Sequence, residues 1–207
     1  MKTIVVAGAG GAAGPPAVLK LAEAGYRVIA VDRIPLERAH PNIVPSQVDL
    51  LDFEAVRKWA AELGPVDGLV HLVGGWRGGK TFADTRLEDW DFLHDLLIRT
   101  LQHTTLGLEF NDGARVAIVS QSGARRPSQG NAAYATAKAA SEAWTLALAD
   151  SFKGSERAAT ILVVKALATG ETRKPGWTHV DDLAGDIVKL WERPAPELNG
   201  KRLELSA

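Results

Sequence analysis

A short apolar segment followed at once by a glycine-rich loop places the strongest constraint on this chain. Residues Thr3–Ala7 are β-branched and apolar, which predicts a strand buried on both faces. The loop Gly8–Gly14 comes next, and Pro15 and Pro16 suit the first helical turn, where a missing N–H costs little. This order directs free N–H groups and the positive end of a helix towards a phosphate. A tight turn without a ligand is the alternative interpretation.

The second predicted strand, 27–31, ends at an acidic residue. Asp32 lies 18 residues beyond Gly14, near the position where a dinucleotide-binding fold places the carboxylate that accepts from ribose hydroxyls. That carboxylate would repel a 2′-phosphate and favour NAD(H), whereas the adjacent Arg33 would pair with the phosphate of NADP(H). We therefore expect NAD(H), with NADP(H) as the alternative.

Strands and helices then alternate to the end of the chain. This pattern predicts a single-domain, Rossmann-type α/β fold over residues 1–207, with a doubly wound parallel sheet of about seven strands. Ligands of such sheets bind at the carboxyl ends of the strands. The further strands are expected at 43–48, 66–73, 115–119, 159–164 and 202–205, and the helices at 15–24, 53–63, 87–108, 131–152 and 180–191.

Composition excludes several function classes. The chain has 24 Lys and Arg against 25 Asp and Glu, so its formal net charge of -1 gives no reason to expect nucleic-acid binding. It contains no cysteine, which excludes disulfides and thiolate chemistry. The histidines lack partners at ligand spacing, so no metal is expected. No signal peptide or membrane span is predicted, and the expected location is cytoplasmic.

The alanine-rich segment from Asn131 to Phe152 carries the candidate acid–base chemistry. It predicts one helix, since neither proline nor glycine interrupts it. Tyr134 and Lys138 are four residues apart and therefore lie side by side on one helix face. A nearby ammonium group is expected to lower the pKa of a phenol towards the working range of an acid–base catalyst. The alternative is a half-buried aromatic residue beside a solvated lysine.

Together these features resemble the short-chain dehydrogenase/reductase family over nearly the whole chain. The resemblance implies an NAD(P)-dependent oxidoreductase that moves a hydride between nicotinamide and a carbonyl, an alcohol or a similar group. Tyr134 would exchange the proton and Lys138 would assist it. The resemblance also implies homodimers or homotetramers. The residues that it assigns to the cofactor are Gly8, Gly10, Gly11, Ala12, Ala13, Gly14, Asp32, Arg33, Asp49, Leu50, Val73, Gly74, Gly75, Tyr134 and Lys138.

Three positions depart from the family pattern. Ala12 replaces the middle glycine of the family loop, although small residues still allow a pyrophosphate to approach. Leu97 stands where many members carry a catalytic asparagine. The slot of the substrate-orienting serine, thirteen residues before Tyr134, holds Gln121 between Ser120 and Ser122. Three possibilities are left open for the hydrogen-bond donor at this position: Gln121 itself, either serine, or no donor. We prefer Ser122 as the catalytic residue, and we expect Gln121 and Ser122 to contact the substrate.

The segment after the predicted fourth strand indicates a subgroup of this family. Residues 73–79, Val-Gly-Gly-Trp-Arg-Gly-Gly, look like the corresponding segment of dihydropteridine reductases, which reduce a quinonoid pterin without the serine. Trp76 would then stack on a flat substrate, or else pack against its own loop. Residues 165–177 form a short lid, which indicates an open site or one completed by a partner subunit.

Two functional hypotheses follow. The first is an NAD(P)-dependent oxidoreductase acting on a carbonyl, an alcohol or a quinonoid pterin-like small molecule. The second is a nucleotide-binding sensor or structural subunit that keeps the fold but has lost turnover. The observations that motivate this second hypothesis are Leu97, Gln121 and the short lid. The intact pair of Tyr134 and Lys138 favours the enzyme.

Overall fold

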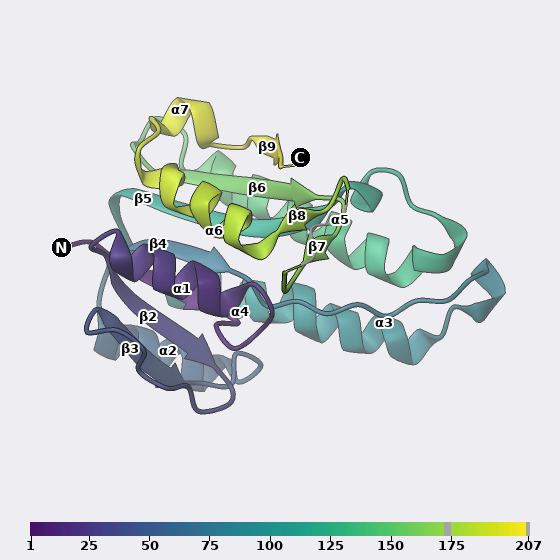
Figure 1. Cartoon of the computed structure of the whole chain (residues 1–207), viewed down its shortest axis with the longest axis horizontal. Helices are drawn as coiled ribbons and strands as arrows, with labels where there is room; N and C mark the ends of the chain where they lie inside the picture. The colour runs from purple at the N-terminus through teal and green to yellow at the C-terminus, as the bar shows by residue number, and fades with distance from the viewer. Residues whose placement is uncertain (172–174, 206–207) are drawn as a thin grey trace.

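A computed structural model describes residues 1–171 and 175–205 of the chain. Its centre is a sheet of seven strands in the order β3-β2-β1-β4-β5-β6-β9, in which every neighbouring pair is parallel (Figure 1). The predicted Rossmann-like parallel sheet in a single domain is therefore confirmed. The strands are β1 (Thr3–Ala7), β2 (Arg27–Asp32), β3 (Ile43–Gln47), β4 (Val66–His71), β5 (Phe110–Gln121), β6 (Ala158–Val164) and β9 (Arg202–Glu204).

Helices cover both faces of this sheet. Helices α1 and α6 pack on one face, and α2, α4 and α5 pack on the other (Figure 1). The chain reverses the direction of winding between β1 and β4, which leaves the carboxyl ends of these strands free for a ligand. The helices are α1 (Gly14–Glu23), α2 (Phe53–Leu63), α3 (Leu87–His94), α4 (Thr100–Gly107), α5 (Ala132–Ser151), α6 (Val180–Val188) and α7 (Ala195–Leu198).

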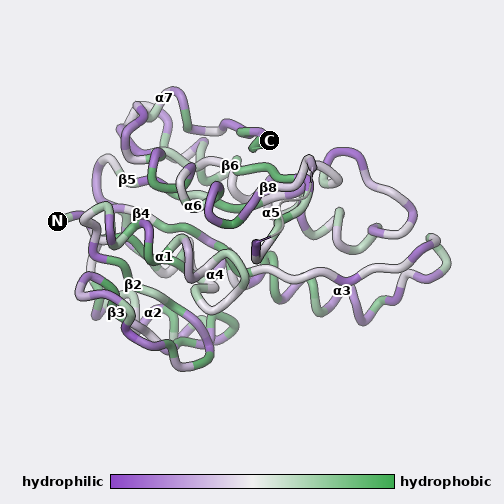
Figure 2. The backbone as a smooth tube through the Cα atoms, in the orientation of Figure 1, coloured by the Kyte–Doolittle hydropathy of each residue, from purple (hydrophilic) through white to green (hydrophobic). Residues whose placement is uncertain are grey.

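Alternating side chains of the central strands fill two separate cores. In β1, Ile4 and Val6 join the core under α1 and α6, whereas Val5 and Ala7 join the core on the opposite face. This two-sided burial explains why the strands are almost entirely apolar. Figure 2 shows the hydrophobic colouring of these strands against the mixed colouring of the outer helices.

Several predicted boundaries shift. The helix expected over 87–108 is divided by a π-helical turn, Asp95–Arg99, between α3 and α4. Strand β4 ends at His71 rather than at residue 73, and β5 begins at Phe110, five residues before its predicted start at Arg115. The last long helix ends at Val188 and continues as a 3₁₀ turn.

Two further features complete the fold. In the segment expected as a short lid, the two-residue strand β7 (Leu167–Ala168) pairs in parallel with β8 (Thr178–His179), which begins just after the segment, while residues 172–174 lie outside the described part of the chain. The ring of His179 caps helix α6 by accepting from the N–H of Asp181. Among the described helices, none combines the length and apolarity needed to cross a membrane.

Candidate active site

The glycine loop turns sharply from β1 into α1. Gly8 has a φ of +77°, and a Cβ atom on it would lie 2.6 Å from the backbone nitrogen of Val73. A Cβ atom on Gly14 would lie 2.2 Å from the carbonyl oxygen of Ala9. Side chains are therefore excluded at both ends of the loop, which brings its backbone against the segment that follows β4.

The middle of the loop presents unused donors. Within the described chain, the N–H groups of Ala12 and Ala13 have no protein acceptor, whereas those of Gly10, Gly11 and Gly14 are bonded internally. Helix α1 has no side-chain cap and no acidic residue in its first turn. Free N–H groups beside an uncapped helix N-terminus fit a phosphate group well. The loop therefore has the donor set that a dinucleotide pyrophosphate requires.

The predicted ribose-binding carboxylate closes the same loop. Asp32 ends β2, and its Oδ2 atom accepts from the N–H of Gly10 at 2.9 Å. Arg33 follows Asp32 in the chain and is exposed. Farther along the same edge, Asp49 is exposed and accepts from the N–H of Leu51, while Leu50 is buried. The remaining predicted cofactor residues, Val73, Gly74 and Gly75, follow β4, with Val73 against Gly8.

Helix α5 places Tyr134 and Lys138 at the carboxyl end of β5. Lys138 is 8% exposed, and its Nζ atom donates to the carbonyl oxygen of Val119 at 2.8 Å. The same Nζ atom lies 5.8 Å from the centroid of the Tyr134 ring. The predicted pair is therefore side by side, with the ammonium group fixed to the sheet.

Burial determines the protonation of both groups. It raises the pKa of Tyr134 to about 12, so the expectation that Lys138 lowers this pKa is wrong for this structure. The reason is that desolvation of the phenolate outweighs a cation that lies beside the ring and bonds to a carbonyl group. Burial also lowers the pKa of Lys138 to about 8, an effect partly opposed by the carboxylate of Glu142.

The three residues at the serine slot face different directions. Ser120 is 1% exposed and donates through Oγ to Glu142, so it points into the interior. Gln121 uses both ends of its amide: Oε1 accepts from the N–H of Gly123 at 2.7 Å, and Nε2 donates to the carbonyl of Lys165 at 3.1 Å. Ser122 is exposed at the start of a 3₁₀ turn. Only Ser122 and the outer edge of Gln121 are accessible to a ligand.

The position of the family asparagine is apolar and buried. Leu97 is 3% exposed within the π-helical turn and packs against the α5 side chains Ala133 and Ala137. Its carbonyl oxygen accepts from Ser141 Oγ at 3.0 Å. A proton relay through a side chain at residue 97 is therefore absent here.

Trp76 lies on a loop that leaves the carboxyl end of β4. It is 62% exposed, and the edge of its ring lies against the backbone of Gly78. The N–H of Gly79 donates to the carbonyl of Gly130 at 2.9 Å, which joins this loop to the one between β5 and α5. These two loops extend beside α3 and α5 beyond the sheet (Figure 1). Trp76 thus packs on its own loop and still offers a broad apolar surface.

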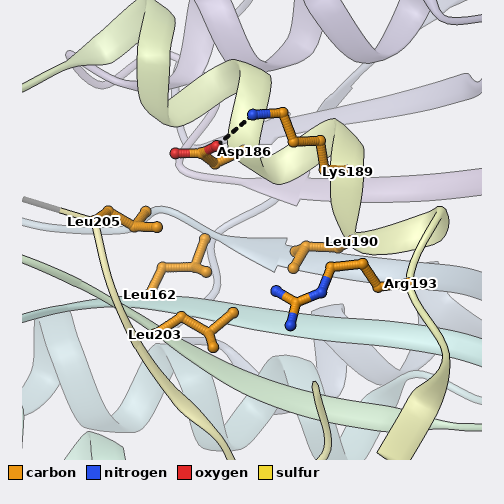
Figure 3. Close-up of a pocket in the computed structure, with 7 residues that line it drawn as sticks. All are labelled: Leu162, Asp186, Lys189, Leu190, Arg193, Leu203 and Leu205. Atoms are coloured by element: carbon orange, nitrogen blue, oxygen red, sulfur yellow. Dashed lines mark hydrogen bonds and ion pairs between the residues drawn. The ribbon is translucent and has the colours of Figure 1, made fainter. Parts of the chain in front are cut away.

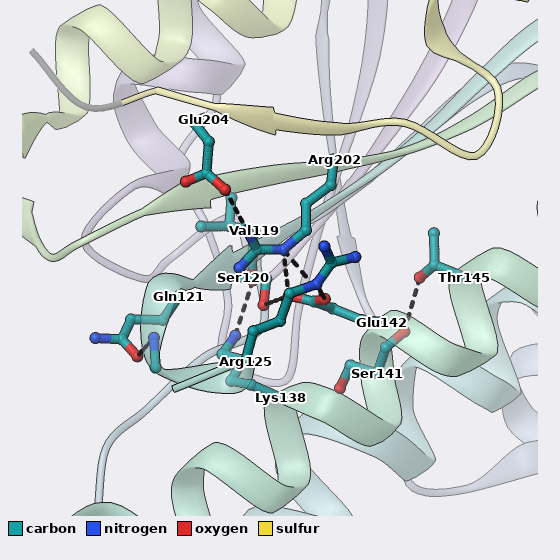
Figure 4. Close-up of polar contacts among 11 residues, drawn as sticks. Val119, Ser120, Gln121, Arg125, Lys138, Ser141, Glu142, Thr145, Arg202 and Glu204 are labelled. Atoms are coloured by element: carbon teal, nitrogen blue, oxygen red, sulfur yellow. Dashed lines mark hydrogen bonds and ion pairs between the residues drawn. The ribbon is translucent and has the colours of Figure 1, made fainter. Parts of the chain in front are cut away.

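Two buried polar residues near Lys138 were not predicted from the sequence as functional residues. His71 ends β4 and is 4% exposed, and its Nε2 atom has no hydrogen-bond partner among the described residues. Burial, and secondarily Lys138, lowers its pKa to about 3, so it is neutral. Glu142 lies one turn beyond Lys138 and meets Arg202 of β9 (Figure 4). A glutamate four residues after Lys138 was the only local signal.

A small cavity lies away from these residues. It has a volume of about 80 Å³ and opens between β6, β9 and the end of α6 (Figure 3). The salt bridge between Lys189 and Asp186, at 2.9 Å, borders it, and leucines form much of its wall. Pockets for drug-sized ligands have volumes of about 300–1,000 Å³, so this cavity is too small to hold such a ligand. The candidate active site is therefore the one at the carboxyl ends of the strands.

Comparisons with known proteins identify the family and the fold of this chain. The family model described as short chain dehydrogenase matches residues 2–178. L-xylulose reductase of Mus musculus is 42% identical over 72 residues, which cover 32% of this chain and only 30% of that reductase.

Solved structures show the same fold across almost the whole chain. Serine dehydrogenase from Escherichia coli has a TM-score of 0.82 at 19% identity, covering 99% of this chain and 97% of that one. An NADPH-bound short chain oxidoreductase with an atypical catalytic center, from Pseudomonas aeruginosa PAO1, has a TM-score of 0.83 at 21% identity over 98% and 94% of the two chains. A Burkholderia cenocepacia J2315 short chain dehydrogenase in complex with NADP has a TM-score of 0.78 at 20% identity over 98% and 95%.

Proposed function

This chain belongs to the short chain dehydrogenase family, and from this premise we propose its function. The protein transfers a hydride between the nicotinamide of NAD(P)(H) and a small carbonyl or alcohol. The observation that carries the proposal is the pairing of Tyr134 and Lys138 on α5, with Lys138 Nζ fixed 2.8 Å from the Val119 carbonyl oxygen. A partly buried phenol beside an ammonium group at the carboxyl end of the sheet is suited to proton transfer.

The glycine loop is the proposed pyrophosphate site. The free N–H groups of Ala12 and Ala13 would donate to the phosphates, and Asp32 would accept from the adenosine ribose. We propose NAD(H) as the preferred cofactor because the Asp32 carboxylate disfavours a 2′-phosphate, with NADP(H) as the rival through Arg33. The rival is the cofactor bound in the two NADP-containing structures described above. When bound, the nicotinamide supplies or accepts the hydride.

The protonated form of Tyr134 can supply the proton that carbonyl reduction requires. With its pKa raised to about 12, the phenol keeps its proton near neutral pH and acts as a general acid. In carbonyl reduction the hydride forms the new C–H bond, and the Tyr134 proton forms the O–H bond of the product alcohol. The Lys138 ammonium lies beside the phenolate that results and limits the cost of its charge.

The proposed substrate site lies between Tyr134, Ser122 and the loop of Trp76. The exposed face of Trp76 would stack on a flat substrate, which keeps a quinonoid pterin among the candidates together with simple carbonyls. Ser122 would hydrogen-bond the substrate oxygen, since Ser120 is committed to Glu142 and most of the Gln121 amide is committed to backbone groups.

A second candidate function is a nucleotide-binding sensor or structural subunit without turnover. Its support is the buried Leu97 and the internal bonding of Gln121, which remove two polar groups that act in many family members. We rank it second because a protein that only binds a nucleotide has no need of a buried lysine beside a partly buried phenol.

The proposed enzyme acts on small molecules in the cytoplasm as a homodimer or homotetramer. Exposed leucines on α4 and α5, Leu106 at 62% and Leu146 at 40%, supply apolar surface for contact between subunits. Sedimentation of the purified protein tests the assembly state, and a monomer at micromolar concentration would contradict it.

The experiment that tests the proposal compares wild type with Tyr134→Phe. Each is mixed with NADH or NADPH and a panel of acceptors that includes simple ketones, aldehydes and quinonoid dihydropterin. The variant should lose at least about a hundredfold in turnover, because it lacks the proton donor, while it still binds the cofactor. Equal turnover by both proteins would contradict the role of Tyr134, whereas cofactor binding without turnover by either would favour the sensor.

A further inference from the structure

The residue that follows Lys138 by one helical turn is a buried carboxylate. Glu142 is 5% exposed and Lys138 is 8% exposed, and a spacing of four places both side chains on the same face of α5. Charged residues are seldom buried to this extent unless they are paired. The two charges therefore have to be considered together.

Strand β5 holds both side chains through two consecutive residues. Val119 accepts from Lys138 Nζ at 2.8 Å, and Ser120 Oγ donates to Glu142 Oε1 at 2.6 Å. Figure 4 shows the two contacts side by side at the end of the strand. A rotation or slide of α5 that would displace Lys138 would also break the contact between Ser120 and Glu142.

Arginines complete the surroundings of the carboxylate. Arg202 Nε lies 3.2 Å from each oxygen of Glu142, and the more exposed Arg125 Nε lies 3.7 Å from Oε2. Arg202 also pairs with Glu204, but its buried Nη2 atom has no hydrogen-bond partner among the described residues. Glu142 is thus the one buried anion of a cluster that contains Lys138 and two arginines.

The groups facing Lys138 come from several elements. Tyr134 and Glu142 lie on α5, His71 lies at the end of β4, and the Val119 carbonyl lies on β5. His71 is neutral, so its ring adds no second positive charge beside the ammonium group. Glu142 is the group that opposes the effect of burial on the lysine.

We propose that Glu142 is a positioning residue for Lys138: its carboxylate, fixed by Ser120 and Arg202, keeps the lysine charged and held against the Val119 carbonyl. The consequence for catalysis rests on the function proposed above, whereas the charge of Lys138 can be measured without any substrate. Arg202 belongs to the last strand, so β9 is connected through Glu142 to the helix that carries Tyr134.

The test measures the titration of Lys138 by NMR in protein labelled with ¹³C at the lysine Cε atoms. A Lys138→Met variant identifies the resonance by its loss. Glu142→Gln alone would leave the mostly buried Arg202 with the more exposed Glu204 as its remaining anionic partner, so the informative variant is the double replacement Glu142→Gln/Arg202→Met, which neutralises both members of the pair. The matched control is Arg202→Met, which keeps the carboxylate and removes a competing cation.

The midpoint of the Lys138 titration should differ between the two variants. The wild-type midpoint is expected near pH 8. The double variant should titrate at least about one pH unit lower than Arg202→Met, because the two proteins differ only in the countercharge of Glu142, and Arg202→Met should titrate higher than wild type. A general loosening of the fold would instead expose the lysine to water and raise both midpoints.

Either variant alone can overturn the proposal. A folded double variant whose Lys138 midpoint equals or exceeds that of Arg202→Met would contradict it. If the double variant does not fold, a midpoint in Arg202→Met that fails to rise would contradict it equally. The absence of any NAD(P)H-dependent turnover would reject the proposed function and leave these midpoints interpretable, so the two failures are distinguishable.

Discussion

The Nζ atom of Lys138 lies 2.8 Å from the carbonyl oxygen of Val119, which joins the middle of α5 to the carboxyl end of β5. This contact holds a long side chain in one conformation inside the protein, at a cost in side-chain entropy of up to about 2 kcal/mol. It also brings the ammonium group to the edge of the sheet where the glycine loop and Asp32 lie.

The lowered pKa of Lys138 leads us to expect opposite effects of alkaline pH on turnover and on the free energy of unfolding. Turnover should fall as the pH rises through about 8, because the ammonium loses its proton. The unfolded chain keeps a lysine proton up to about pH 10.4. Between these values it therefore binds more protons than the native state, so this lysine makes the free energy of unfolding increase with pH.

Lys138→Met checks both effects. Turnover should fall roughly 10²–10⁴-fold, and the remaining activity should lose its decline above pH 8. Urea unfolding at pH 7.5 and 9.5 should show a smaller rise in stability for the variant than for wild type. A variant that keeps the alkaline decline would show that another group causes it.

His71 predicts a loss of stability in acid. Burial lowers its pKa to about 3, against about 6.5 in an unfolded chain, so between these values the unfolded state binds an extra proton. Falling pH therefore favours unfolding, by about 1.4 kcal/mol per pH unit from this one group. His71→Leu should reduce the slope of the unfolding free energy between pH 4.5 and 6 by about that amount. Identical slopes, measured by urea unfolding, would refute the buried neutral imidazole.

Two glycine-to-alanine substitutions should change the free energy of unfolding in opposite directions. Gly14→Ala places a Cβ atom 2.2 Å from the Ala9 carbonyl oxygen, and overpacking of this kind costs about 1–3 kcal/mol. Gly185→Ala in α6 meets no atom within 4 Å and should stabilise the helix by about 0.5–1 kcal/mol. Thermal and urea unfolding measure both. Gly14→Ala with wild-type stability would be inconsistent with the tight turn into α1.

Local spacing predicted those parts of the fold and of the candidate site that depend on neighbours in sequence. The glycine loop precedes a helix, Asp32 ends a strand, and Tyr134 and Lys138 share a helix face, as their patterns indicate. The π-helical turn at Leu97 was missed, because hydrophobic periodicity near 3.6 residues hardly changes when one turn is widened.

Contacts distant in sequence were beyond such patterns. Arg202 meets Glu142 across 60 residues, and Ser120 turns inwards because that carboxylate is there. The direction of the Tyr134 pKa shift was wrong for a related reason. A spacing of four reveals the neighbouring cation but not the burial that outweighs it.

The most direct measurement of the central claim is a titration of the protein with NADH and with NADPH, followed by nicotinamide fluorescence, in wild type and Asp32→Asn. The substitution keeps an oxygen acceptor for the Gly10 N–H and removes the charge. We predict tighter binding of NADH than of NADPH by wild type, and a roughly tenfold or greater shift towards NADPH in the variant. Comparable affinities in wild type would assign the selection to Arg33, and binding of neither nucleotide by folded protein would contradict the account.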